Sequence, residues 1–388
     1  MSSHAASSLV VTSERRVWLS RLRLENFRNY ESLELELENG LNFFHGPNGS
    51  GKTSLLEAVS YLAVARSLRG ANDGEVVRWG ESGFGVGGRV ETGDGSTNVV
   101  VRYARGGRKE ATVDGDELTR LSELVGSLRV AWFCPEDTWI TKGGPAERRR
   151  LIDVALCQID RSYLSALVEY RRALRQRNEA LSAWTPDEES DRLVAVWTQR
   201  LVESGSRVVG ARLRFLPLYR KAVKAAHAAI AEDEGIDLVY RGSFPAGDEE
   251  GGASDENVKR RFNEALSRAA SDERRRGFTL VGPHRDDVEV RVGGRPLRTF
   301  GSQGQHRTAA IALKLGEAAV LDEDGRGVVV LLDDILSELD DRRGGSLVDL
   351  VGRYGQALVT STRPAPPGFL TGAASAEFAV GGGEVTRT

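Results

Sequence analysis

A glycine-rich stretch near the amino end combines the residue types and the spacing needed to hold phosphate groups. The pattern G-x-x-x-x-G-K-[ST] is matched by Gly46, Pro47, Asn48, Gly49, Ser50, Gly51, Lys52 and Thr53, and Ser54 follows. In such a loop the backbone N–H groups and the N-terminus of the next helix face the phosphates of a nucleotide, where geometry and the helix dipole favour an anion. We expect Lys52 to reach the β- and γ-phosphates and the Thr53 hydroxyl to bind Mg²⁺.

Two carboxylates close an apolar run in the C-terminal part of the chain. Residues 328–334 read VVVLLDD, which is typical of a buried parallel strand that ends in polar residues. A carboxylate in that place can supply the second protein ligand for the Mg²⁺ of a bound nucleotide, and we assign this role to Asp333. Asp334 points elsewhere and is the candidate to polarise the attacking water.

A third motif, FGSQGQHR at 300–307, opens a predicted helix. Ser302 is a predicted N-cap, and the N-terminus of its helix is a second place that favours an anion. Ser302, Gly304 and Gln305 are therefore candidate phosphate contacts. The tetrapeptide SELD follows at 337–340. A phosphate loop, a long insertion, an S-x-G-Q helix, a D-D strand and S-x-L-D occur in this order in ABC-type ATPases.

The surrounding pattern supplies the elements that would position these residues. Alternating apolar residues over 17–40 predict two strands. Residues 41–46 predict a third strand, which runs into the glycine loop, and 54–68 predict the helix after it. After further short strands with glycine turns, a helical region intervenes, and strands return after Gly277.

The helical region from 145 to 276 is rich in Arg, Ala, Glu and Leu. Apolar residues at a seven-residue spacing predict two long helices packed as a short antiparallel arm. These residues are Leu167, Leu174 and Leu181 in one helix, and Leu201, Val208 and Phe215 in the other. Pro217 is expected to kink or break the second helix.

The expected fold is therefore an α/β, ABC-type ATPase head, with a mixed sheet flanked by helices and an inserted helical arm lobe. We divide the chain into a disordered tail at 1–15, the first part of the head at 16–144, the arm lobe at 145–276 and the second part of the head at 277–388.

Composition restricts the class of protein further. The formal charge of −3 gives no overall attraction to nucleic acid, so a surface for it must be local. Cys134 and Cys157 have no C-x-x-C spacing, which argues against a disulfide framework or a zinc site and suits a reducing cytoplasm. No apolar window reaches the ~18 residues of a membrane helix, and residues 1–16 lack the pattern of a secretory signal.

Several blocks together resemble one family, the RecF recombination mediators, which are related to the SMC group of DNA-repair ATPases. The blocks are LENFRNY, GPNGSGKTSLLEA, ARSLRG, FCPEDTWITKGGPAERRRLID, YRRALRQRNEAL, GPHRDD, GSQGQHR and LLDDILSELDDRR, and they cover roughly residues 18 to 365. Such a combination in one order is highly specific.

The resemblance implies that two ATP molecules are sandwiched between two heads. Lys52 and Asp333 of one subunit would then face Ser302 and Gly304 of the other. It also implies that Arg28 and Asn29 contact the nucleotide and that Arg66 and Arg69 form a basic segment beside it. Glu136 or Asp137 would stand where related ATPases place a Mg²⁺-sensing Gln.

Activity and partners are likewise implied by the resemblance. We expect a weak, DNA-stimulated ATPase, because Asp334 replaces the Glu of many ABC ATPases, and Ser361 or Thr362 stands near the place of the switch histidine. The expected partners are duplex DNA near gaps and single-strand junctions, RecR, RecO and, indirectly, RecA. The expected site of action is the cytoplasm, at the nucleoid.

Other interpretations of the function can be compared with this one. The long insertion argues against a transporter ATPase. The small number of heptads argues against a long-armed SMC protein, and the lack of an N-K-x-D motif argues against a GTPase. A nucleotide-switched scaffold that barely hydrolyses ATP is not excluded. Arginine clusters at 148–150, 171–177 and 274–276 would suit a DNA groove or, equally, a solvated helical face.

Overall fold

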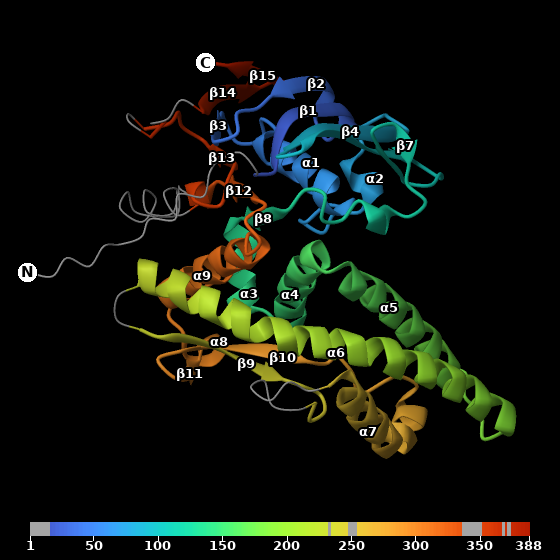
Figure 1. The fold of residues 1–388 in the computed structure, drawn as a ribbon. Coiled ribbons are helices and arrows are strands. Elements are labelled where there is room, and N and C mark those ends of the chain that lie inside the picture. Colours follow the sequence, from blue (N-terminus) through green and yellow to red (C-terminus); the bar gives the residue numbers. More distant parts are fainter. Residues whose placement is uncertain (1–15, 232–233, 247–253, 336–350, 367–368, 371–373) are drawn as a thin grey trace, which may run out of the picture.

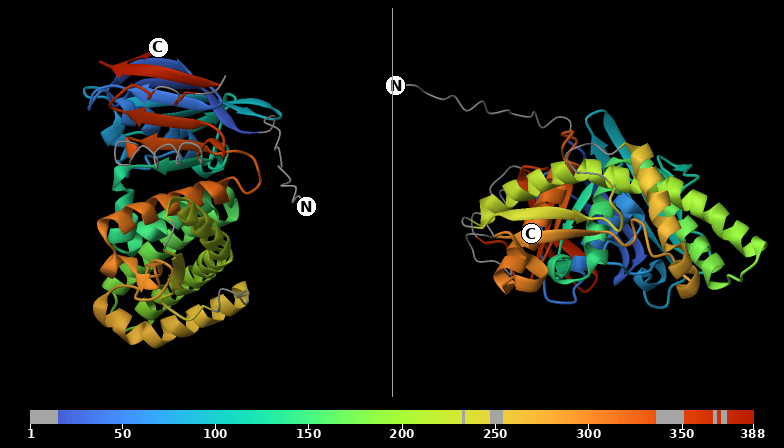
Figure 2. Two further views of the ribbon diagram at one scale, coloured as in Figure 1. Left: turned by 90° about the vertical axis from the view of Figure 1, so that its left-hand side faces the viewer. Right: turned by 90° about the horizontal axis from the view of Figure 1, so that it is seen from below.

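The computed structural model describes residues 16–231, 234–246, 254–335, 351–366, 369–370 and 374–388. They form two lobes stacked one above the other, with the C-terminal strands in the upper lobe and the long helices in the lower one (Figures 1 and 2). The predicted tail at 1–15 and the S-x-L-D motif at 337–340 lie outside the described residues.

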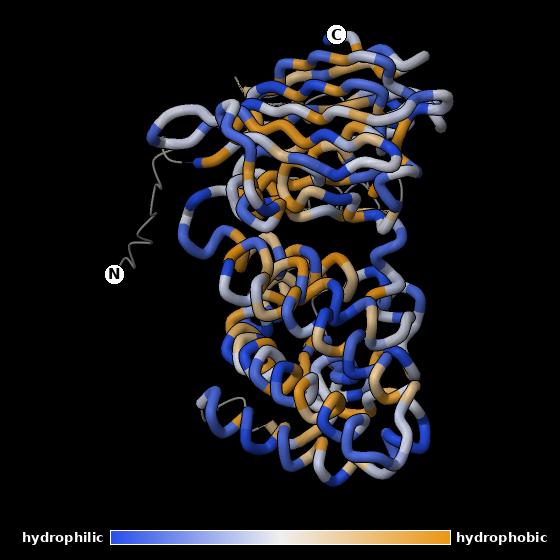
Figure 3. The backbone as a smooth tube through the Cα atoms, turned by 90° about the vertical axis from the view of Figure 1, so that its right-hand side faces the viewer, coloured by the Kyte–Doolittle hydropathy of each residue, from blue (hydrophilic) through white to orange (hydrophobic). Residues whose placement is uncertain are grey.

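The upper lobe contains two sheets. The first has the strand order β2-β1-β4-β5-β6-β7 and is antiparallel. Its strands are β1 Trp18–Phe27, β2 Tyr30–Glu36, β4 Gly83–Thr92, β5 Gly95–Ala104, β6 Glu110–Val113 and β7 Asp116–Glu117. Hydrophobic and hydrophilic residues alternate along strands of this lobe, as expected where one face of a strand is buried (Figure 3).

The second sheet has the order β15-β14-β3-β13-β12-β8, and its pairs are parallel except for β14 with β15. Its strands are β3 Leu41–His45, β8 Val130–Phe133, β12 Val329–Asp333, β13 Ala357–Ser361, β14 Ser375–Gly381 and β15 Glu384–Arg387. β12 is buried along its whole length, as its unbroken apolar run predicts. The sequence analysis did not predict β14 and β15.

Helix α1, Lys52–Val64, lies between the two sheets. Apolar residues on both of its sides, such as Val59 and Tyr61, share one core with strands of both sheets. The short elements α2 (Asp73–Val76), η2 (Leu121–Glu123) and η3 (Pro135–Asp137) connect the strands around this core. The helix that follows the glycine loop is thus fixed on both faces.

The lower lobe is mainly helical. Its elements are α3 Thr138–Lys142, α4 Pro145–Ile159, α5 Arg161–Ser182, α6 Glu188–Ile230, α7 Asp255–Arg276, α8 Leu297–Phe300 and α9 Gln303–Leu321, with a sheet of β9 Ile236–Arg241, β10 Asp287–Val292 and β11 Arg295–Pro296. α5 and α6 form the predicted antiparallel pair (Figure 1). The predicted break at Pro217 is absent, because α6 continues through that residue to Ile230.

The packing places the lobe boundary differently from the division at residue 276. Residues of β10, α8 and α9, including Val290, Leu297 and Ala312, share one core with α5 and α6. The opposite side of α9, with Ile311 and Leu315, packs against β8 and β12 of the upper lobe. α9 is buried on nearly all sides, so its residues belong to both cores and its sequence shows no boundary.

Within the described part of the chain, no helix combines the length and the apolar character required to cross a membrane.

Candidate nucleotide-binding site

The glycine loop lies between the end of β3 and the start of α1. Gly51 has φ 111°, a left-handed conformation that glycine tolerates, and a Cβ there would lie 2.5 Å from Asn29 Nδ2. The Lys52 ammonium donates hydrogen bonds to the carbonyl oxygens of Gly46 at 2.8 Å and Pro47 at 2.9 Å. Burial lowers the Lys52 pKa, while Asp334 and Asp333 raise it. The loop thus holds a cation at its centre, as the sequence predicts.

Asp333 lies against this loop because the parallel strands end at one edge of the sheet. The register pairs Asp333 with Thr360 and Ser361 with His45, so β12, β13 and β3 bring their carboxyl ends together. Asp333 Oδ1 accepts hydrogen bonds from Thr53 Oγ1 at 2.8 Å and from Thr360 Oγ1 at 2.9 Å. Residues distant in sequence thereby form one cluster of oxygen atoms.

This cluster fits a magnesium ion. Two neighbouring ligands of an octahedral Mg²⁺, each ~2.1 Å from the ion, lie ~2.9 Å apart, and the Thr53 and Asp333 oxygens are 2.8 Å apart. Burial raises the Asp333 pKa, against the hydrogen bonds from Thr53 and Thr360, which lower it. A nearby cation would favour the ionised carboxylate. Thr53 and Asp333 are therefore the residues that could hold the metal.

Asp334 leaves the strand in a different direction. It has φ 50°, and its backbone N–H donates to Thr360 Oγ1 at 2.9 Å. Its side chain lines a groove on the surface that is also lined by Lys52 and Thr53. The residue of β13 that contacts both aspartates is Thr360, one position before Ser361. The register of β13 against β12 decides this, and it could not be read from the sequence.

The turn between β1 and β2 is hydrogen-bonded to the glycine loop. Asn29 Nδ2 donates to Ser50 O at 3.0 Å, and Tyr30 Oη donates to Gly51 O at 3.1 Å. Arg28 forms a bidentate pair with the fully buried Glu57 at 2.7 and 2.8 Å, and it also lines the groove. Arg28 and Asn29 are predicted from the sequence, whereas Tyr30 and Glu57 are not. An acidic residue inside an apolar helix is the signal that could have found Glu57.

The basic segment after α1 contributes one arginine to the groove. Arg69 lines it together with Asn48, Gly49 and Ser54, and its charge lowers the pKa of Asp333. Arg66 does not line this groove. The groove also contains Arg78 and Trp79, which the sequence analysis did not single out.

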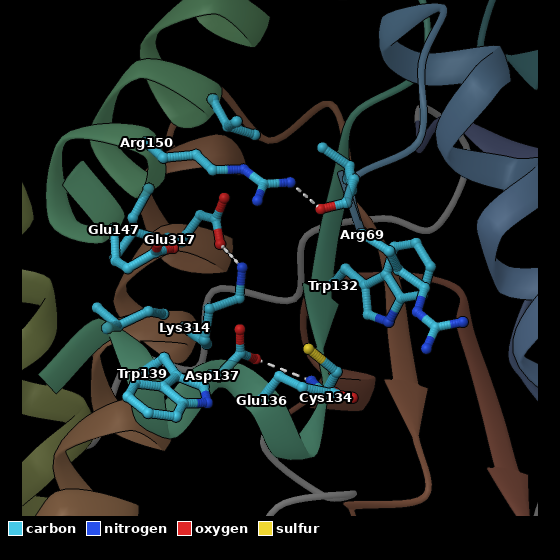
Figure 4. Close-up of a pocket in the computed structure, with 14 residues that line it drawn as sticks. Arg69, Trp132, Cys134, Glu136, Asp137, Trp139, Glu147, Arg150, Lys314 and Glu317 are labelled. Atoms are coloured by element: carbon cyan, nitrogen blue, oxygen red, sulfur yellow. Dashed lines mark hydrogen bonds and ion pairs between the residues drawn. The ribbon is translucent and has the colours of Figure 1, made fainter. Parts of the chain in front are cut away.

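Glu136 and Asp137 line the same pocket between the lobes but differ in exposure. Asp137 Oδ2 accepts from the backbone N–H of Cys134 at 2.8 Å, and Asp137 lines a pocket between the lobes with Lys314 and Glu317 (Figure 4). Burial raises the Asp137 pKa. Glu136, in contrast, is exposed and close enough to raise the pKa of Asp333.

Ser302, Gly304 and Gln305 lie in the other lobe, at the N-terminus of α9. Ser302 Oγ accepts from the Gln305 N–H at 3.2 Å, and Gln305 Oε1 accepts from the Ser302 N–H at 2.8 Å, which confirms Ser302 as the N-cap. Ser302 and Gly304 are exposed. Among the described residues, none of the three lines the groove that contains Lys52. One chain therefore does not bring the two predicted phosphate sites together.

The arginine clusters divide into buried and exposed members. Arg148 pairs with Asp287 at 2.7 Å and Arg177 with Glu273 at 2.6 Å, and both arginines are buried. They connect elements of the lower lobe and are not available to DNA phosphates. Arg172 and Arg175 remain exposed on α5.

Comparison with known proteins agrees with this geometry. A family model described as the RecF/RecN/SMC N terminal domain matches residues 18–366. The DNA replication and repair protein RecF of Symbiobacterium thermophilum is 40% identical over 348 residues, which are 89% of this chain and 92% of that protein. RecF of Salinibacter ruber is 39% identical over 361 residues, or 90% of this chain and 85% of that protein.

Solved structures are similar as well. The recombination mediator protein RecF in its ATPrS form in the RecFOR pathway has a TM-score of 0.87 and 31% identity, covering 97% of this chain and 99% of that one. An Smc head domain from Pyrococcus furiosus has a TM-score of 0.55 at 15% identity, covering 96% of each chain, and supports the fold alone. The fold is therefore that of an ABC-type ATPase head with a helical lobe. The chain belongs to the RecF/RecN/SMC N-terminal domain family and, within it, to the RecF proteins.

Proposed function

We propose that this protein is an ATP-dependent DNA clamp that acts in recombinational repair of gapped DNA and in maintenance of replication forks. The observation that carries the proposal is the joining of the glycine loop to the D-D strand, through the 2.8 Å contact between Thr53 and Asp333. RecF relatives of this chain are named DNA replication and repair proteins, and one solved RecF structure is described with ATP.

In the proposed site the residues of one chain divide the work of binding and hydrolysis. The loop N–H groups and Lys52 bind the β- and γ-phosphates. Thr53 and Asp333 would hold Mg²⁺, which would neutralise charge on the phosphates. Asp334 orients the attacking water, and Glu136, whose charge raises the pKa of Asp333, takes the Mg²⁺-sensing place. An Asp at 334 has a shorter reach than a Glu, so we expect slow, DNA-stimulated hydrolysis that acts as a timer.

The site is completed by a second copy of the chain. The N-terminus of α9 is exposed, carries the N-cap Ser302 and would favour an anion, yet its own chain brings it no phosphate site. A second head turned to face the first would place Ser302, Gly304 and Gln305 on the nucleotide held by Lys52. ATP would then close two subunits over duplex DNA, and hydrolysis would release them.

DNA would be bound through its phosphates, which makes binding salt-dependent and largely independent of sequence. The partners we propose are RecO and RecR, since the similar solved structures are described as part of the RecFOR pathway. The outcome would be loading of RecA at gaps near junctions of single- and double-stranded DNA.

The first test is the mass in solution, measured by light scattering with a slowly hydrolysed ATP analogue and Mg²⁺, with and without duplex DNA. We expect a dimer that forms with the nucleotide and binds DNA more tightly. Ser302→Arg should prevent the dimer while leaving nucleotide binding through Lys52 intact, because a long cation would occupy the space meant for the phosphate.

Ser254→Arg is the matched control. Ser254 is also an exposed serine that caps a long helix, α7, and accepts a hydrogen bond from Asn257 N–H at 3.3 Å. The Ser254→Arg variant should dimerise like the parent. A mass that does not change with nucleotide, or equal behaviour of Ser302→Arg and Ser254→Arg, would remove the sandwich.

A further inference from the structure

One large aromatic side chain is exposed beside the phosphate-binding loop. Trp79 lines the groove together with Lys52 and Thr53. Its side chain is 96% exposed, the highest fraction among the large hydrophobic residues that the structure describes. Packing within the chain therefore does not explain a tryptophan there, because nearly all of its apolar surface remains in water.

A hydrogen-bonded turn fixes the backbone at Trp79. Glu81 N–H donates to Arg78 O at 3.0 Å, which closes a turn with Trp79 and Gly80 in the middle. Gly80 has φ 90°, as the third position of a type II turn requires, so the turn is stable without strain. A side chain at the second position of such a turn projects outward.

This turn is attached to the loop that would hold the phosphates. Arg78 N–H donates to Asn26 O at 2.8 Å, and Arg28 N–H donates to Val76 O at 2.7 Å, so the segment is bonded to the end of β1 on both sides of Val77. The next residue, Asn29, is bonded to Ser50 O. Trp79 is therefore positioned relative to the glycine loop by a short, continuous set of hydrogen bonds.

The groove has chemically different walls. Lys52, Asp333 and Asp334 provide charges, and Thr53 provides a hydroxyl, suited to phosphates and a metal. The turn with Trp79 provides an aromatic face. A nucleotide has the same two parts, a charged triphosphate and a flat aromatic base, so the groove matches a whole nucleotide better than a phosphate alone.

We propose that the indole of Trp79 stacks on the adenine base of the bound ATP. The proposal rests on the proposed ATP binding and adds a residue that recognises the base. Stacking of a base on an aromatic side chain changes affinity by about tenfold or more on alanine substitution. It uses the face of the base and not its hydrogen-bonding edge, so GTP should bind almost as well as ATP.

The experiment compares ATP with inorganic triphosphate, both with Mg²⁺, by calorimetry. All proteins carry Ser302→Arg, so that binding is measured on the monomer. The unsubstituted Trp79 protein should bind ATP at least tenfold more tightly than triphosphate. Trp79→Ala should lose about tenfold in ATP affinity and nothing in triphosphate affinity, and Trp79→Phe should restore most of the loss.

Trp139→Ala is the matched control. Trp139 is 61% exposed but lines the pocket between the lobes and not this groove. The Trp139→Ala variant should bind ATP and triphosphate like the parent. A second readout is tryptophan fluorescence, which should be quenched by ATP and not by triphosphate, and this quenching should be lost in Trp79→Phe.

Two outcomes would overturn the assignment of Trp79. The first is an ATP affinity that Trp79→Ala leaves unchanged in the Ser302→Arg background. If Trp79→Ala lowers ATP affinity only in the protein that keeps Ser302, the indole contacts the second subunit and not the base. The second is an equal loss for ATP and triphosphate, which would mean a structural role. If the parent binds neither ligand, or if Lys52→Ala binds both as the parent does, the proposed nucleotide site fails instead.

Discussion

At the scale of single residues, two adjacent aspartates have different geometries and so different expected roles. Asp333 is buried and holds Thr53 and Thr360 by hydrogen bonds, while Asp334 turns away with φ 50°. Asn tolerates that left-handed conformation as Asp does, so a change at 334 can remove the charge without straining the backbone. Neighbours in sequence can therefore be tested separately.

We predict that Asp334→Asn lowers ATP hydrolysis by about 10²- to 10⁴-fold, the usual contribution of a positioned base. ATP affinity should stay within a few-fold of the parent, and the dimer formed with ATP should last longer. Asp333→Asn should instead weaken Mg²⁺-dependent ATP binding itself. Single-turnover hydrolysis and equilibrium binding separate the two effects. Equal loss of binding in both variants would contradict the division of roles.

At the scale of elements, buried ion pairs hold the lower lobe in one arrangement. Arg177 of α5 donates to Glu273 of α7 at 2.6 Å and to Thr279 at 2.8 Å, and Glu273 also accepts the Leu280 N–H at 2.7 Å. Arg177 and Glu273 are both buried. Removal of one partner leaves the other charge buried, which is more harmful than removal of both.

The corresponding prediction is a double-mutant cycle. Arg177→Met should lower the free energy of unfolding by about 3 kcal/mol, because Glu273 loses its partner in the interior. Arg177→Met combined with Glu273→Leu should recover part of that loss. Arg192→Met, which removes the exposed i,i+4 pair with Glu188, is the control and should change stability by less than about 0.5 kcal/mol. Chemical unfolding of the parent, these three variants and Glu273→Leu alone completes the cycle, and additive losses at 177 and 273 would contradict the coupling.

At the scale of the whole molecule, α9 is the element that connects the two lobes. Its N-terminus carries Ser302, and its sides belong to the cores of both lobes. A nucleotide that contacts Ser302 from another subunit would therefore act on an element packed against both lobes. ATP-driven association should in this way place two sets of surface arginines on one stretch of DNA.

The salt dependence of DNA binding tests this consequence. Each neutralised DNA phosphate contributes about −0.9 to the slope of log affinity against log salt concentration. We expect the slope with an ATP analogue to be about twice that without it, as two copies replace one. Ser302→Arg should keep the shallower slope in both conditions, and Ser254→Arg should behave like the parent. A slope that does not change with nucleotide would count against the clamp.

The local chemistry of the site can be predicted from the amino-acid sequence. The glycine loop, the carboxylates at the end of an apolar strand and the N-cap serine depend on residue types over a few neighbouring positions, and the structure places each on the predicted element. The family also followed from the sequence, because several separate motifs occur in one order. Short-range patterns are enough for these features, since the backbone conformation they require is set by nearby residues.

Contacts between residues far apart in the chain depend on the packing of the whole fold. Thr360 contacts Asp333 because strand register is set by pairing over the whole sheet. Glu57 lies beside the site because it packs there and pairs with Arg28, and Trp79 lies there because its turn is hydrogen-bonded to β1. α6 continues through Pro217, and α9 belongs to both lobes, because packing on several sides can outweigh local preference. Such contacts join residues far apart in the chain, so no local pattern encodes them.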